Sequence, residues 1–143
     1  MKKIISKIFL ILLFLSSKSF ALIEVDITRG NLNPLPVAVS PLYADSDSKE
    51  KISKDLNDLE IGIEISKIIE NNLKKTGLFN PLKKEAFVQN PDIAHLKPRF
   101  EDWKLIKAQA LITGKVELID EKLRVEFRLW DVLAGREMLA LAF

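Results

Sequence analysis

Cysteine is absent from this sequence of 143 residues. Its absence excludes disulfide bonds and thiolate metal sites. It also excludes a lipid anchor joined to a cysteine near the N-terminus, since that route needs a thiol to acylate. We therefore expect the folded domain to be stabilised by the packing of apolar side chains.

Histidine is almost as scarce, because His95 is the sole example. It lies in a connection between Pro91 and Pro98, and the surrounding residues offer few partners for a metal or acid–base site. We interpret it as a surface or capping histidine. Hydrolase, P-loop and dinucleotide motifs are also missing. The sequence thus predicts no catalytic residue, no cofactor and no metal.

Two adjacent acids and two tryptophans could still form a binding or catalytic site. Glu101 and Asp102 are neighbouring acids and so resemble a glycosidase pair, but adjacent residues on a helix diverge and helix N-termini favour acids. We favour a structural role for both. Trp103 falls on an apolar face and is predicted to be in the core, whereas Trp130 falls on the polar face of its strand. An exposed aromatic contact is therefore expected at Trp130.

Long apolar runs are absent except near the N-terminus. A basic start precedes the run Ile8–Leu15, and Ser19-Phe20-Ala21 places small residues at positions −3 and −1 of a cleavage site. This layout is typical of a secretory signal peptide covering residues 1–21. The alternative is a membrane anchor, which needs about 20 apolar residues. We expect cleavage between Ala21 and Leu22, export to the periplasm and no membrane span afterwards.

No charge of one sign dominates the chain. It carries 22 basic and 20 acidic residues, and cleavage would remove four lysines and no acid, leaving a net charge of −2. A nucleic-acid surface needs clustered positive charge, so no nucleic-acid partner is expected. The remaining length, residues 22–143, suits one domain.

Alternating apolar and polar residues predict five strands. They cover residues 22–27, 36–40, 110–118, 123–129 and 138–143. Prolines around the second strand suit a sheet edge or the strand ends, because proline has no N–H for the ladder. The third and fourth strands predict a hairpin that turns at Asp120-Glu121-Lys122, with one buried and one solvent-exposed face. Gly135 marks the next turn, and residues 44–53 read as a loop.

Residues 56–75 are the main helix candidate, although residues 60–65 alternate as a strand would. Four-residue spacing along the segment favours the helix. Asn57 and Glu60 could cap its start, and Gly77 suits its end. A shorter helix is predicted at residues 100–106. The predicted core consists of sheet residues Val116, Leu118, Val125, Phe127 and Leu129, covered by helix residues Ile61, Ile65, Ile69 and Leu73, with Ile68 in the same stripe.

Several segments, taken in order, resemble the TolB N-terminal domain family. They are Gly77–Leu82 (GLFNPL) after the long helix, Ala108–Gly114 (AQALITG) after Trp103, and Val125–Val132 (VEFRLWDV). The Pro-flanked strand near the start of the mature chain fits as well. The resemblance covers essentially all of residues 22–143.

The resemblance implies an α/β (α+β) fold, a mixed β-sheet of about five strands packed by two helices. It also implies a C-terminal six-bladed β-propeller that binds the Pal lipoprotein and is intercepted by bacteriocins. No propeller is present here, and residues 139–143 end on an apolar strand, so we expect the native protein to continue.

In this family the N-terminal strand binds the inner-membrane protein TolA. The corresponding residues are Leu22, Ile23, Glu24, Val25, Asp26, Ile27 and Thr28. One hypothesis is that they form a switchable strand that pairs with a partner, and the other is a permanently paired edge strand.

Three functions are compatible with these observations. The first is an adaptor of the Tol–Pal system that keeps the outer membrane intact and aids its invagination during cell division. The second is a periplasmic ligand-binding module or enzyme of unknown substrate. The third is RNA binding by fold analogy, which export and the net charge of −2 oppose.

Overall fold

The computed structural model describes residues 33–45, 47–48 and 60–143. In this part of the chain, six strands form one mixed sheet with the order β3-β1-β4-β5-β6, and β2 pairs with β4. The strands are β1 (Leu35–Val39), β2 (Tyr43–Ala44), β3 (Phe79–Pro81), β4 (Ala110–Ile119), β5 (Lys122–Asp131) and β6 (Arg136–Ala142). The helices are α3 (Ile61–Lys75), α4 (Pro91–Ala94) and α5 (Phe100–Leu105), with a 3-10 turn η1 (Lys84–Ala86). The predicted α+β fold with a mixed sheet is confirmed.

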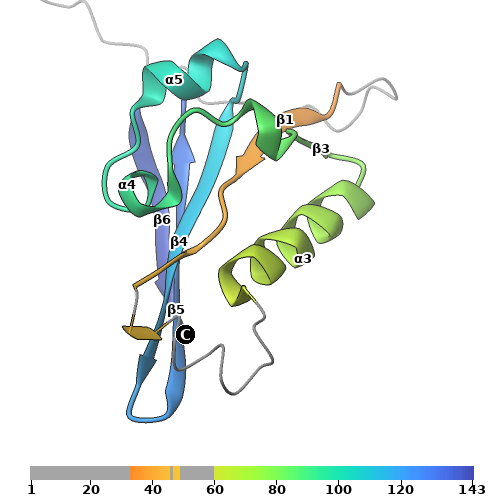
Figure 1. The fold of residues 1–143 in the computed structure, drawn as a ribbon. Helices are drawn as coiled ribbons and strands as arrows, with labels where there is room; N and C mark the ends of the chain where they lie inside the picture. The colour runs from red at the N-terminus through yellow and green to blue at the C-terminus, as the bar shows by residue number, and fades with distance from the viewer. Residues whose placement is uncertain (1–32, 46, 49–59) are drawn as a thin grey trace, which may run out of the picture. The chain divides into compact units, whose positions relative to one another are not determined.

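Strand β1 lies inside the sheet, parallel to β3 on one side and to β4 on the other (Figure 1). The prolines were predicted to lie either at a sheet edge or at the strand ends, and the strand ends are correct. Pairing of β1 with β4 begins at Val37, so the missing N–H of Pro36 falls just before that ladder. The short strands β2 and β3 were not predicted, because two or three residues are too few to show alternation.

The predicted hairpin of β4 and β5 is confirmed, with antiparallel pairing from Ala110↔Asp131 to Ile119↔Lys122. Its two turn residues, Asp120 and Glu121, both have positive φ angles. That conformation matches the twist of two-residue hairpin loops. Gly135 also has a positive φ angle, at the predicted second turn.

Helix α3 ends as predicted but starts later. Gly77 follows it with φ of +71°, and the Thr76 hydroxyl donates to the Leu73 carbonyl over 2.7 Å. The predicted start at Leu56 is wrong, because Glu60 occupies the N-cap with a non-helical ψ of 81° and makes no side-chain capping bond. Asn57, the predicted cap, lies outside the described residues.

The first core cluster joins α3 to the sheet as predicted, but the predicted members Ile69, Leu73 and Leu129 are not part of it. Leu42, Ala44 and Val116 are buried there. Around them pack the partly buried residues Ile61, Ile65, Leu118, Val125 and Phe127. The sheet face assigned to the core is therefore correct.

The buried positions of α3 differ from the predicted stripe. They are Gly62 and Ser66, whereas Ile68 is 59% exposed. The physical reason is a close approach: Leu42 donates its N–H to the Gly62 carbonyl over 3.2 Å, and a Cβ on residue 62 would collide with the Leu42 carbonyl oxygen. Because Gly62 has no side chain, its side of α3 packs directly on the backbone of Leu42. Ile68 then faces away from the core.

A second core cluster covers the opposite face of the hairpin, which corrects the prediction of a solvent-exposed face. Its buried members are Ala38, Ala94, Trp103, Ala108, Leu111, Trp130 and Val132. Trp130, predicted to be exposed, is only 8% exposed and donates its Nε1–H to Thr113 Oγ1 over 2.8 Å. Residues of α4 and α5 cover this face, so a polar strand pattern was a poor guide to burial here. The core position predicted for Trp103 is confirmed.

Candidate protein-binding surface

The predicted partner-binding strand, residues 22–28, lies outside the described residues, as does the cleavage site between Ala21 and Leu22. Both therefore stay predictions. The other residues considered in the sequence can be located in the structure.

His95 follows the last turn of α4. Its Nδ1 lies 3.0 Å from the Pro91 carbonyl oxygen, and its ring stacks on Tyr43 with 4.4 Å between centroids. The predicted capping position is confirmed, but the ring is buried rather than at the surface. Among residues 33–45, 47–48 and 60–143, no three histidine or acidic side chains gather as a metal site would require.

The adjacent acids of α5 form local ion pairs, as the structural interpretation predicted. Glu101 Oε1 lies 2.9 Å from Lys104 Nζ, and Asp102 Oδ2 lies 2.7 Å from Arg99 Nη2. Both acids are in the first turn, where a carboxylate stabilises the helix dipole.

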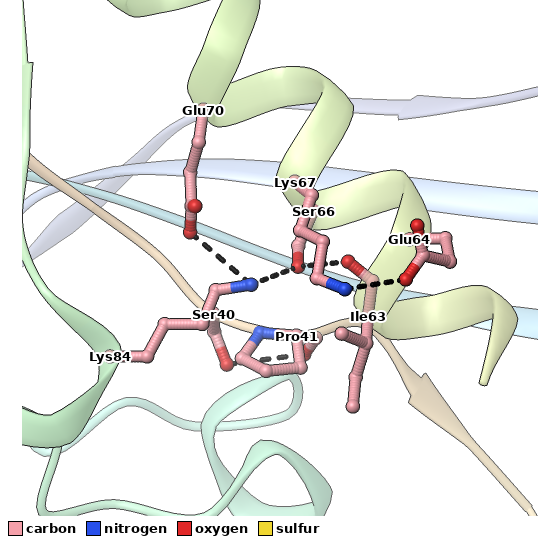
Figure 2. A network of polar contacts seen from close by, with 8 residues as sticks. All are labelled: Ser40, Pro41, Ile63, Glu64, Ser66, Lys67, Glu70 and Lys84. Atoms are coloured by element: carbon pink, nitrogen blue, oxygen red, sulfur yellow. Dashed lines mark hydrogen bonds and ion pairs between the residues drawn. The ribbon is translucent and has the colours of Figure 1, made fainter.

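A polar network between α3 and η1 was not predicted. Lys84 Nζ donates to Ser66 Oγ over 2.7 Å and lies 3.3 Å from Glu70 Oε1 (Figure 2). The Ser66 hydroxyl in turn donates to the Ile63 carbonyl over 2.7 Å. Ser66 and Lys84 are 18 residues apart, so no local pattern could have paired them.

A serine beside a lysine is also the arrangement of some hydrolases. Here the Ser66 side chain is fully buried and its proton is directed at a backbone carbonyl. Lys84 is the donor in its bond to Ser66, whereas a general base would have to accept a proton from the hydroxyl. The geometry therefore favours a structural role, fastening η1 onto α3.

Replacing Lys84 by methionine is expected to lower the free energy of unfolding by about 1–2 kcal/mol, because Ser66 loses a charged donor and Glu70 loses its ion-pair partner. The pair is partly exposed to solvent, which keeps the loss at the low end of the range for charged hydrogen bonds. Urea unfolding measures it. The matched control is Lys83→Met at an exposed position, expected to change stability by less than about 0.5 kcal/mol. Equal losses in both variants would contradict the assignment.

An apolar groove of about 310 Å³ opens on the sheet face that carries α3. It is lined by Ile69, Ile112, Phe127, Arg128, Leu129, Leu139 and Leu141. Leu139 and Leu141 are about half exposed, and Phe127 and Leu129 beside them are only partly buried. Exposed apolar side chains gathered along one groove make it a candidate interaction surface.

The groove continues to strand β6, which is an edge of the sheet within the described residues. Its charged residues are Arg136 and Glu137 at one end, and the rest of the strand is apolar. Natural edge strands are normally shielded by charges, bulges or a covering element. Groove and edge together therefore form a surface suited to another polypeptide rather than to a small polar substrate.

The profile of the TolB amino-terminal domain matches residues 23–138. The chain belongs to the TolB N-terminal domain family. It is 68% identical over 136 residues to the Tol-Pal system protein TolB of Pelagibacter ubique (strain HTCC1062), covering 95% of this chain and 30% of that protein. It is 42% identical over 111 residues to the same-named protein of Paramagnetospirillum magneticum (strain ATCC 700264 / AMB-1), covering 77% of this chain and 23% of that one. This TolB-family chain thus spans under a third of the length of these relatives.

One solved structure of another protein shows a similar fold. The C-terminal domain of LpoB from Salmonella enterica superposes with a TM-score of 0.53 at 12% identity, covering 80% of this chain and 84% of that one. TolB from Acinetobacter baumannii gives 0.47 at 18% identity, covering 77% of this chain and 23% of that one. Within the described residues of the TolB-family chain, no helix has the length and apolarity to cross a membrane.

Proposed function

We propose that this chain is the N-terminal part of a periplasmic adaptor that binds proteins and catalyses no reaction. It acts in the Tol–Pal system, where it maintains outer-membrane integrity and aids outer-membrane invagination during cell division. The observation that carries the proposal is the family match over residues 23–138, together with relatives named Tol-Pal system protein TolB.

In this proposal residues 22–28 bind TolA by strand pairing. Ile23, Val25 and Ile27 alternate with Glu24 and Asp26, so one face of an extended segment is apolar and the other charged. Strand pairing gains affinity from main-chain hydrogen bonds and specificity from alternate side chains. Gly30 follows the segment and leaves its backbone few restrictions.

Pal would bind a part of the protein outside this chain, because the chain covers 30% of its Pelagibacter relative and residues 33–45, 47–48 and 60–143 form no propeller. The same part would be the target of bacteriocins. In this proposal Pal binding changes how available residues 22–28 are to TolA. Such a change needs a free-energy difference of only a few kcal/mol between two paired states of the strand.

Deleting residues 22–27 from the mature protein is expected to abolish TolA binding and leave the melting temperature unchanged. A fluorescence or calorimetric titration with purified TolA measures the first, and thermal unfolding the second. The matched control is Glu24→Gln with Asp26→Asn, which keeps the apolar alternation and is expected to retain most of the affinity.

TolA binding that is equally tight with the deletion would contradict the proposed site. The outer edge of β6 would then be the next surface to test, since within the described residues β6 pairs with β5 on one side and with no strand on the other. Capture of envelope proteins on the mature protein would show which other partners compete for it.

A further inference from the structure

Residues 83–98 form a strap that joins the two core clusters of the domain. The strap follows β3, contains η1 and α4, and ends just before α5 (Figure 1). Its near end is attached to α3 through Lys84, whereas its far end carries Ala94, which is buried in the cluster on the opposite face of the sheet. A single segment with little regular structure therefore reaches both faces of the sheet.

The backbone of the strap is not part of the sheet. The Leu82 N–H donates to the Val37 carbonyl over 2.9 Å, just before the strap begins. Among the residues that the structure describes, the backbone–backbone hydrogen bonds of residues 83–98 then stay within the strap itself. The strands β4 and β5, in contrast, are joined by a continuous ladder along their whole length. The strap can therefore leave the fold without breaking any bond of the sheet.

Side chains alone hold the strap to its surroundings. The contacts are Lys84 with Ser66 and Glu70 of α3, Phe87 and Gln89 with Trp103 of α5, and His95 with Tyr43 of β2. These attachments are spread along the strap, so neither half of it is held by backbone pairing alone. Segments attached in this way open more readily than the strands of a sheet.

Gln89 connects the two halves of the strap. Its Nε2–H donates to the Lys97 carbonyl over 3.2 Å. Its Oε1 accepts from the Arg99 N–H over 2.9 Å and from the Trp103 Nε1–H over 3.1 Å. The side chain is 4% exposed, so these bonds are protected from water. Because one side chain bonds the far end of the strap and α5 together, release at one end loosens the other.

We propose that the strap opens as one unit while the sheet stays folded, and that it is a gate over the apolar face beneath it. Trp103 is 1% exposed in the closed domain. Opening removes both Phe87 and Gln89 from its indole and makes it accessible. Proteins commonly open through cooperative units smaller than the whole domain. The inference does not depend on TolA binding.

Hydrogen exchange of the full-length mature protein, followed by mass spectrometry, tests this gate. The readouts are the amides of η1 at the near end of the strap, those of α4 at its far end, and those of the β4–β5 ladder as the reference. After correction for intrinsic rates, we expect both ends of the strap to exchange at least about tenfold faster than the ladder. Equal rates in strap and ladder would overturn the proposal, because the strap would then open only when the domain unfolds.

Lys84→Met tests whether the strap is one unit. Lys84 contacts α3 only at the near end, so a cooperative opening requires α4 to exchange faster by the same factor as η1. We expect about fivefold or more at both ends. Lys83→Met, at an exposed position, is the matched control and should change neither end. Acceleration confined to η1 would overturn the proposal, since the two ends would then open separately.

Val125→Ala separates opening of the strap from unfolding of the domain. Val125 packs in the cluster beneath α3, which stays intact when the strap opens. We expect the ladder amides to exchange about fivefold faster or more, because unfolding becomes easier. The strap amides should change by less than about twofold. Equal acceleration of strap and ladder would show that both exchange through the same global unfolding, which would overturn the proposal.

Discussion

Replacing Trp103 by alanine is expected to lower the free energy of unfolding by about 3–5 kcal/mol. The indole is 1% exposed and sits in the cluster that covers the second face of the sheet. It also packs edge-on against Phe87, with 5.1 Å between ring centroids. The truncation leaves a cavity that neighbouring side chains on short helices and loops can fill only in part. Urea or thermal unfolding of the mature protein measures the loss.

The same substitution leaves a polar group with fewer partners. Gln89 Oε1 accepts from Trp103 Nε1 over 3.1 Å and from the Arg99 N–H over 2.9 Å, and Gln89 is itself buried. Trp103→Phe should therefore be milder than Trp103→Ala but still destabilising, because it loses this bond. Leu105→Ala on the same helix is the control, expected to cost less than about 0.5 kcal/mol. A loss for Trp103→Ala no larger than that for Leu105→Ala would contradict the assigned core.

Replacing Gly62 by valine is expected to destabilise the protein by about 3 kcal/mol or more. A Cβ at this position would overlap the Leu42 carbonyl oxygen, which is backbone and cannot rotate away. The helix would have to move off the sheet, breaking the Leu42 N–H bond to the Gly62 carbonyl. Denaturant unfolding measures the change.

Gly62→Ala tests the same close approach through the sign of the change in stability. At an ordinary helix position, alanine in place of glycine stabilises by about 0.5–1 kcal/mol. At residue 62 the collision should reverse that sign. Asn72→Ala, at an exposed position of the same helix, is the control and should be neutral or slightly stabilising. A Gly62→Ala protein as stable as the native one would show that α3 does not approach Leu42 so closely.

The side of the sheet on which Phe127 lies was predictable, but its burial was not. Alternation placed it correctly with Val116 and Val125 opposite Ile61 and Ile65. Phe127 also lines the groove and is only partly buried, although the predicted core included it. Burial depends on what covers a residue, and that information comes from other elements.

Local sequence determined the features that depend on neighbouring residues. The hairpin at Asp120-Glu121, the helix end at Gly77 and the turn at Gly135 follow from backbone preferences over a few positions. The family resemblance is of the same kind, since ordered short segments carried it and the match over residues 23–138 confirmed it.

Other features depend on contacts between residues that are far apart in the chain, and only the tertiary structure decided them. Trp130 looked exposed because alternation reports the two faces of a strand but cannot tell that α4 and α5 cover the second one. Ile68 looked buried because helical spacing defines a stripe, while the close approach at Gly62 sets which part of that stripe meets the sheet. Lys84 and Ser66 were unremarkable in sequence and became partners only when η1 folded against α3. In each case the deciding contact joins residues far apart in the chain, where periodicity carries no information.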